Sequence, residues 1–154
     1  MCLNVADEHV QELAVSFRGL VERCDKSNLQ LHIQRFPCGS CGDVCWLLAR
    51  FLADREAPGF HYFCGSRRKP ERRDSQISSH AWLQHGDLIV DITADQFIEI
   101  DGPIIITRLS DWHAELDGED KGVADYRERY RSEPGVLANF EEAYERIVVN
   151  SNGT

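Results

Sequence analysis

The order of apolar patterns along the chain predicts an α+β domain. Helical spacing dominates both ends of the sequence, while strand-like alternation dominates much of its middle. At 154 residues the chain is long enough to bury one hydrophobic core, and no composition shift or repeat divides it. We therefore predict a single domain over 1–154, with helices at its N- and C-terminal ends and strands between them.

Four helices are expected. An amphipathic helix is predicted over 6–24, where apolar residues recur at largely helical spacing. The run DVCWLLARFLADR (43–55) is apolar on nearly every side and predicts a central, buried helix, with Asp43 favouring the positive end of its dipole. A C-terminal helix is predicted to start at Pro134, and Ser110 can cap a short helix that follows it.

Several segments between these helices have the composition of short strands. They are LQLHIQRF (29–36), which is either a strand or an extended lead-in, HYFCG (61–65), the hairpin-like run SSHAWLQHGDLIVDIT (78–93), FIEID (97–101) and PIIITRL (103–109). The basic segment SRRKPERRDSQ (66–76) is expected to be a solvated surface loop, with a flap or a contact to an acidic partner as the alternative.

The composition of the chain limits the classes of binding partner that we expect. The net charge of −9 disfavours nucleic acid, whose phosphates are bound through Lys and Arg. No apolar run approaches the roughly 18–20 residues that span a bilayer, so no membrane partner is expected. The N-terminus lacks the pattern of a signal peptide, which predicts a cytoplasmic protein with free thiols, although export by a specialised secretion system is left open.

The hairpin within 78–93 carries two ionisable residues. A two-residue turn at His85–Gly86 would place His80 directly opposite Asp91, with Cβ atoms about 4.5–5.5 Å apart. That register also gathers the apolar residues of both strands on the other face, namely Ala81, Leu83, Leu88, Val90 and Ile92. A structural His–Asp pair beside the core is the alternative to a functional one.

A cysteine cluster, CGSCGD (38–43), lies where a glycine-punctuated loop enters the apolar helix. Cys41 is best placed at the junction, where unpaired backbone N–H groups and the helix dipole favour a thiolate and can bind an oxyanion. Cys45 is expected in the core, and Cys38 is expected to be a spectator or a redox neighbour. No role is assigned to Cys2, Cys24 and Cys64.

Two of these motifs resemble known enzymes. CGSC (38–41) resembles the nucleophile motif of papain-like cysteine proteases, and HAWLQHGDLIVDIT (80–93) is similar to the His and Asp strands of transglutaminase-like enzymes. The resemblance implies a papain/transglutaminase-like core, in which a nucleophile helix packs on an antiparallel sheet. It further implies that Cys41 is the nucleophile, His80 the general base and Asp91 the carboxylate that orients it.

The same resemblance implies a reaction. It is that of a thiol-dependent amide hydrolase or acyl transferase (deamidase, peptidase or transglutaminase type) that acts on a protein or peptide through a thioester and needs no cofactor. Gly42 stands where papain-like enzymes have an aromatic residue, and Arg35 stands at the position of their oxyanion-hole glutamine. Gln34, one position further away, is the candidate second oxyanion donor, and Trp82 is either a wall of the acyl channel or a packed aromatic.

Two other functions are considered. One is a catalytically inactive transglutaminase-like interaction protein, with the basic segment 67–73 or the acidic C-terminal region as its contact surface. The other is a zinc-binding module that uses Cys38, Cys41 and Cys45 with His80. Asp87 and Asp95 are weaker candidates for the acid role than Asp91. The sequence indicates no partner for the remaining histidines considered, His61, His85 and His113.

Overall fold

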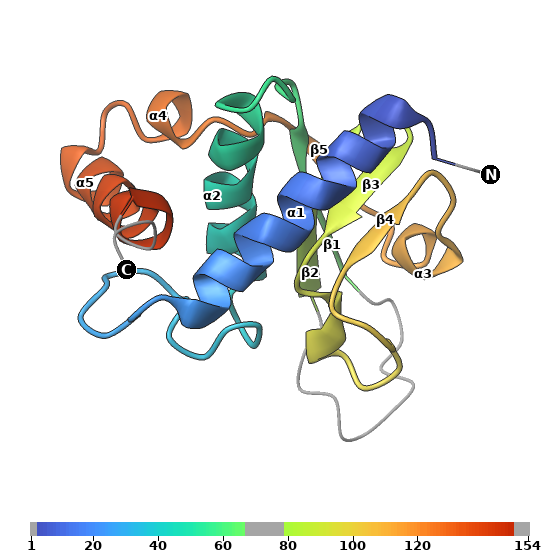
Figure 1. Ribbon diagram of the computed structural model, residues 1–154, viewed down its shortest axis with the longest axis horizontal. Helices are drawn as coiled ribbons and strands as arrows, with labels where there is room; N and C mark the ends of the chain where they lie inside the picture. Colours follow the sequence, from blue (N-terminus) through green and yellow to red (C-terminus); the bar gives the residue numbers. More distant parts are fainter. Residues whose placement is uncertain (1–2, 67–78, 150–154) are drawn as a thin grey trace.

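The computed structural model describes residues 3–66 and 79–149, and in this part the predicted α+β class is confirmed. A five-stranded antiparallel sheet has the order β4-β3-β2-β1-β5 (Figure 1). Its strands are β1 (His61–Ser66), β2 (Ser79–His85), β3 (Leu88–Asp91), β4 (Ile105–Thr107) and β5 (Glu119–Val123). The basic segment predicted as a loop lies almost wholly outside the described residues.

The three longer helices confirm the predicted ones. They are α1 (Val5–Arg23), α2 (Cys41–Ala53) and α5 (Pro134–Tyr144), the last of which continues as a π-helical turn, η2 (Glu145–Val149). Ser110 caps the short helix α3 (Asp111–Ala114), as expected, and the remaining helical turns are η1 (Ala94–Gln96) and α4 (Tyr126–Arg129). None of the helices within 3–66 and 79–149 has the length and apolar character needed to cross a membrane.

Helix α2 forms the centre of the packing. It contacts β2 of the sheet on one side and α1 and α4 elsewhere, and Figure 1 shows it between the sheet and α5. Nearly all of its residues from Val44 to Leu52 are buried, as its all-round apolar sequence predicts. The predicted apolar face of the hairpin is also confirmed, since it belongs to the same core cluster as α2, with Ala81, Leu83, Leu88, Val90 and Ile92.

The hairpin register differs from the prediction by two residues. Leu83 pairs with Val90 and His85 with Leu88, so the turn is Gly86–Asp87 and not His85–Gly86. The first central residue of such a tight turn needs a positive φ, and Gly86 supplies it at +60°, whereas a histidine there would be strained. A shift of two residues preserves the faces of both strands.

Two predicted strands are wrong. The segment 29–36 buries Leu29, Leu31 and Ile33, as its alternation suggests, but its backbone forms turns. The segment 97–101 also turns, because the N–H groups of its residues 97 and 100 bond to carbonyls three residues back. Alternation reports which side chains face the core, but a strand also needs a neighbouring strand edge to pair with.

Two further elements, the edge strand β5 and the short helix α4, carry no pattern that predicts them. Strand β5 has mostly exposed residues and pairs only with β1 among the described strands, so it lacks the apolar alternation that predicts strands. Helix α4 has four residues, too few for a periodic pattern. Strand β1 lies between β5 and the hairpin, and α4 contacts α2 and α5.

Candidate active site

Asp91, the last residue of β3, is 2% exposed and accepts hydrogen bonds at both oxygens. Its Oδ2 lies 2.6 Å from Nε2 of His80 and 2.8 Å from Nε2 of His113. Its Oδ1 accepts the backbone N–H of Thr93 at 3.0 Å, with the Thr93 hydroxyl at 3.5 Å. Burial alone would raise the pKa of Asp91, but the bonds from His113 and His80 outweigh it and hold the pKa well below its usual range.

His80 lies on β2 with its ring fully enclosed, at 1% exposure. In the observed register it is offset diagonally from Asp91 and not directly opposite, a separation that a long side chain can bridge. Because Nε2 is bonded to Asp91, Nδ1 is the ring nitrogen left for other partners. Burial lowers the pKa of His80, but the hydrogen bonds and charges of Asp91 and Cys41 outweigh it and raise the pKa to about 9.

Cys41 is the first residue of α2 and follows the buried N-cap residue Ser40, whose hydroxyl donates to the Pro37 carbonyl at 2.9 Å. The imidazole of His80 and the backbone N–H of Ala81 are close enough to the Cys41 sulfur to favour its thiolate form. Burial raises the pKa of the Cys41 thiol, yet these two partners outweigh burial, so the pKa falls below its ordinary value of 9.0. The structure therefore brings Cys41, His80 and Asp91 together.

Gln96 ties the cysteine loop to this cluster and was not singled out from the sequence. Its Oε1 accepts the N–H of Gly39 at 3.3 Å, and its Nε2 donates to the carbonyl of Thr93 at 3.0 Å. The same Nε2 lies 3.4 Å from Nδ1 of His80. Gln96 thus spans the glycine loop before Cys41 and the turn after Asp91.

His113 is the second residue that the structure adds to the predicted site, and the expectation that it has no partner is wrong. Its ring is 2% exposed and bonds Asp91 through Nε2 and Ser110 through Nδ1, the latter at 2.7 Å. Ser110 three positions before a histidine is a local signal that places His113 in the first turn of a helix. Nothing in that signal indicates that the helix packs against Asp91. His61 also has a partner, since its Nδ1 lies 2.9 Å from Asp120.

The other two candidate residues lie in different surroundings. Gln34 is exposed, and its side-chain N–H₂ donates to the Leu29 carbonyl, so one of its two hydrogens is already engaged. Trp82 is 2% exposed, shares the His80 face of β2, and packs against His113 with ring centroids 5.0 Å apart. This burial leaves Trp82 little surface for a substrate.

Within the described ranges, the one group of three metal-ligating side chains that lies close together is His80, Asp91 and His113, whose ligand atoms are within 4.8 Å of one another. Two imidazoles and a carboxylate suit zinc. However, the contacts are 2.6 and 2.8 Å long, which are the lengths of hydrogen bonds from two donors to one acceptor. Cys45 is buried and its pKa is raised well above 9.0, mainly by burial, which disfavours the thiolate needed for a cysteine zinc site.

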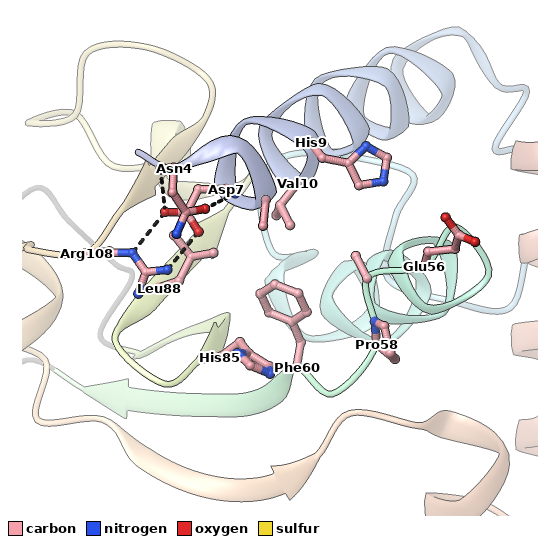
Figure 2. Close-up of a pocket in the computed structure, with 12 residues that line it drawn as sticks. Asn4, Asp7, His9, Val10, Glu56, Pro58, Phe60, His85, Leu88 and Arg108 are labelled. Carbon is pink, nitrogen blue, oxygen red and sulfur yellow. Dashed lines mark hydrogen bonds and ion pairs between the residues drawn. The ribbon is translucent and has the colours of Figure 1, made fainter. Parts of the chain in front are cut away.

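A separate cavity of about 290 Å³ opens between the start of α1, the α2–β1 connection and the hairpin turn (Figure 2). Phe60 forms part of its apolar floor, and Arg108 at its rim is engaged by the carboxylate of Asp7 at 2.8 and 2.9 Å. His85 lines this cavity, and it is five residues along β2 from His80, about 16 Å at about 3.3 Å per residue. The cavity is therefore distinct from the cysteine–histidine–aspartate cluster.

The fold and the site together define an α+β protein in which a cysteine at a helix N-terminus meets a buried histidine–aspartate pair. Comparisons of the chain with protein-family models, with curated proteins and with solved structures found no match. A functional interpretation consequently rests on the chemistry of the site itself.

Proposed function

We propose that this chain is a thiol-dependent amide hydrolase or acyl transferase, of the deamidase, peptidase or transglutaminase type. The arrangement of Cys41, His80 and Asp91 carries the proposal. One nitrogen of the buried imidazole is bonded to the carboxylate of Asp91, and the other, which has the Gln96 amide at 3.4 Å, is the one proposed to serve the cysteine sulfur. The pKa shifts of all three groups favour a thiolate–imidazolium pair. This is the arrangement by which a base and an orienting acid activate a sulfur nucleophile.

The reaction follows from these positions. The Cys41 thiolate attacks the carbonyl carbon of an amide, and the electron pair of the C=O bond moves to the oxygen. When the tetrahedral intermediate collapses, the C–N bond breaks and the His80 imidazolium gives its Nδ1 proton to the leaving amine. Water or an amine, deprotonated by His80, then attacks the thioester and releases Cys41. Asp91 keeps the ring oriented throughout and stabilises its positive charge.

The oxyanion has one donor in the chain's own backbone. The first N–H groups of a helix have no partner within the helix, and Cys41 is the first residue of α2. Its N–H is therefore the proposed first donor, and the dipole of α2 adds to it. Gln34 remains the predicted second donor, for which its second amide hydrogen would have to turn toward the substrate.

We also propose that the core is papain/transglutaminase-like. Helix α2, which begins with the cysteine, packs on an antiparallel sheet at β2, and the chain supplies the cysteine, the histidine and the aspartate in that order. Nucleophile, base and orienting acid all come from this chain, so the proposed reaction requires no cofactor. The proposed substrate is a protein or peptide, which offers both side-chain and backbone amides.

Intact-protein mass spectrometry after treatment with a thiol-directed electrophilic amide probe tests the proposal. The native chain should take up one label, and Cys41→Ala should abolish it. His80→Ala should slow it strongly, because the thiolate loses the imidazolium that stabilises it. Cys38→Ala is the matched control, since Cys38 is an exposed thiol three residues away, and its label should equal that of the native chain.

Turnover is tested separately with a glutamine-containing protein such as casein. Ammonia release without added amine indicates deamidation, incorporation of a fluorescent amine indicates transamidation, and new peptides indicate proteolysis. Each activity should disappear in Cys41→Ala. Labelling that survives Cys41→Ala, or a Cys41 that reacts like a free cysteine in both the native chain and His80→Ala, would instead support the inactive interaction protein.

A further inference from the structure

The strongest unexplained feature beside the site is the continuation of its hydrogen bonds beyond Asp91. His113 donates to the carboxylate that His80 also uses, and Ser110 lies 2.7 Å behind it, on Nδ1. The backbone N–H of His113 in turn donates to the Ser110 oxygen at 3.2 Å. A chain of bonds therefore runs from Ser110 through His113 and Asp91 to His80.

The chemistry of these groups limits where the protons can lie. An ionised carboxylate only accepts hydrogen bonds, so Nε2 of His113 must carry the hydrogen that faces Asp91. In the neutral ring Nδ1 is then an acceptor, and the Ser110 hydroxyl donates to it while accepting the backbone N–H. Every donor in this chain has one acceptor, and one tautomer of His113 satisfies all of them.

We propose that His113, held in its Nε2–H tautomer by Ser110, is a positioning residue that fixes Asp91 for its bond to His80. The proposal rests on the proposed function of the Cys41–His80–Asp91 cluster. Two donors converge on the single oxygen Oδ2 of Asp91, while Thr93 holds the other oxygen. The carboxylate therefore cannot rotate without breaking a bond at each end.

His113 can do this because its own ring is held on several sides. Its centroid lies 4.8 Å from that of Trp112 and 5.0 Å from that of Trp82, with both indoles roughly perpendicular to it. Such edge-to-face contacts restrict an aromatic ring as well as burying it.

A set of variants distinguishes the hydrogen bond that His113 donates to Asp91 from the packing of its ring. His113→Phe keeps an aromatic ring but removes the donor, whereas His113→Gln keeps a side-chain N–H that reaches about as far as Nε2. His61→Phe is the matched control, because it removes the ring bond to Asp120 at an exposed position. The readout is the pH profile of Cys41 alkylation by iodoacetamide, followed by mass spectrometry of the Cys41 peptide, with circular dichroism to confirm folding.

His113→Phe should slow alkylation near neutral pH and shift the profile to higher pH. We expect a slowing of about ten- to hundredfold, by analogy with the loss of a residue that hydrogen-bonds a metal ligand. His113→Gln should recover most of that loss, and His61→Phe should match the native chain. A folded His113→Phe with the native profile would overturn the proposal. So would a His113→Gln that is as slow as His113→Phe, because the donor would then not be what matters.

A second measurement needs no variant, and it decides the matter if His113→Phe does not fold. Nitrogen-15 NMR of the native chain should show a hydrogen on Nε2 of His113, the nitrogen that faces Asp91. A hydrogen on Nδ1 and none on Nε2 would overturn the proposal, since Nε2 would have nothing to donate. Alkylation and NMR require no substrate, so an absence of amide turnover would count against the proposed function while leaving the positioning role measurable.

Discussion

The substitution Asp91→Asn changes the carboxylate group that accepts the most hydrogen bonds in the site. Both carboxylate oxygens act as acceptors, with two imidazole N–H groups on one and the Thr93 N–H on the other. An asparagine must replace one of these acceptors with an N–H₂ group, which then faces an N–H donor whichever way the amide turns. No orientation of the amide satisfies all of the neighbours in their present tautomers.

The size of the effect follows from the two orientations. If the amide nitrogen faces Thr93, a buried donor is left unpaired at a cost of about 1–3 kcal/mol. If it faces the imidazoles, His80 must move its hydrogen to Nδ1, the nitrogen left for Cys41, and can no longer accept the thiol proton. In both cases the negative charge that helps raise the pKa of His80 to about 9 is lost. The same change in a serine-protease triad lowers the rate by about ten-thousandfold.

We therefore expect Asp91→Asn to lose about 1–3 kcal/mol of unfolding free energy and to lower turnover by about three to four orders of magnitude. Urea denaturation measures the stability, and the casein and iodoacetamide assays measure the site. Asp120→Asn is the control, because Asp120 also accepts a bond from a histidine but lies exposed on the edge strand; it should change neither property appreciably. Native stability and native Cys41 reactivity in Asp91→Asn would refute the reasoning.

Three further predictions follow from the same contacts. Turnover should rise with pH as the Cys41 thiol ionises below 9.0 and fall as His80 loses its proton near pH 9, which a pH–rate profile checks. The folded-state pKa of Asp91 is lowered from 3.8 and that of His80 is raised from 6.5, so the two groups together should stabilise the fold most between pH 3.8 and 6.5. The contribution of Asp91 should be lost as the pH falls below 3.8, and that of His80 as the pH rises toward 9. Urea midpoints measured across this pH range test the prediction. Gly65→Ala should destabilise by about 1–3 kcal/mol, since a Cβ there would lie 2.5 Å from the Leu116 carbonyl oxygen, and a thermal midpoint equal to that of the native chain would contradict it.

Local sequence patterns were sufficient for most of the helices and for three members of the site, Cys41, His80 and Asp91. The spacing of apolar residues predicted α1, α2 and α5, and the alternation in the hairpin identified its core face. The junction of a glycine loop with an apolar helix singled out Cys41, and the shared face of the hairpin singled out His80 and Asp91. These signals are local, because helix and strand periodicities are properties of a few consecutive residues.

The tertiary structure decided how these residues are supported. The need for a positive φ at Gly86 set the hairpin register, which moved His80 from a position opposite Asp91 to a diagonal one. His113 and Gln96 joined the site from segments after the hairpin, through bonds of 2.8 and 3.4 Å to Asp91 and His80. Such contacts depend on how irregular segments fold back onto the sheet, and no local period encodes that path. The sequence therefore singled out the three groups of the proposed reaction, and the packing decided which other groups hold them in place.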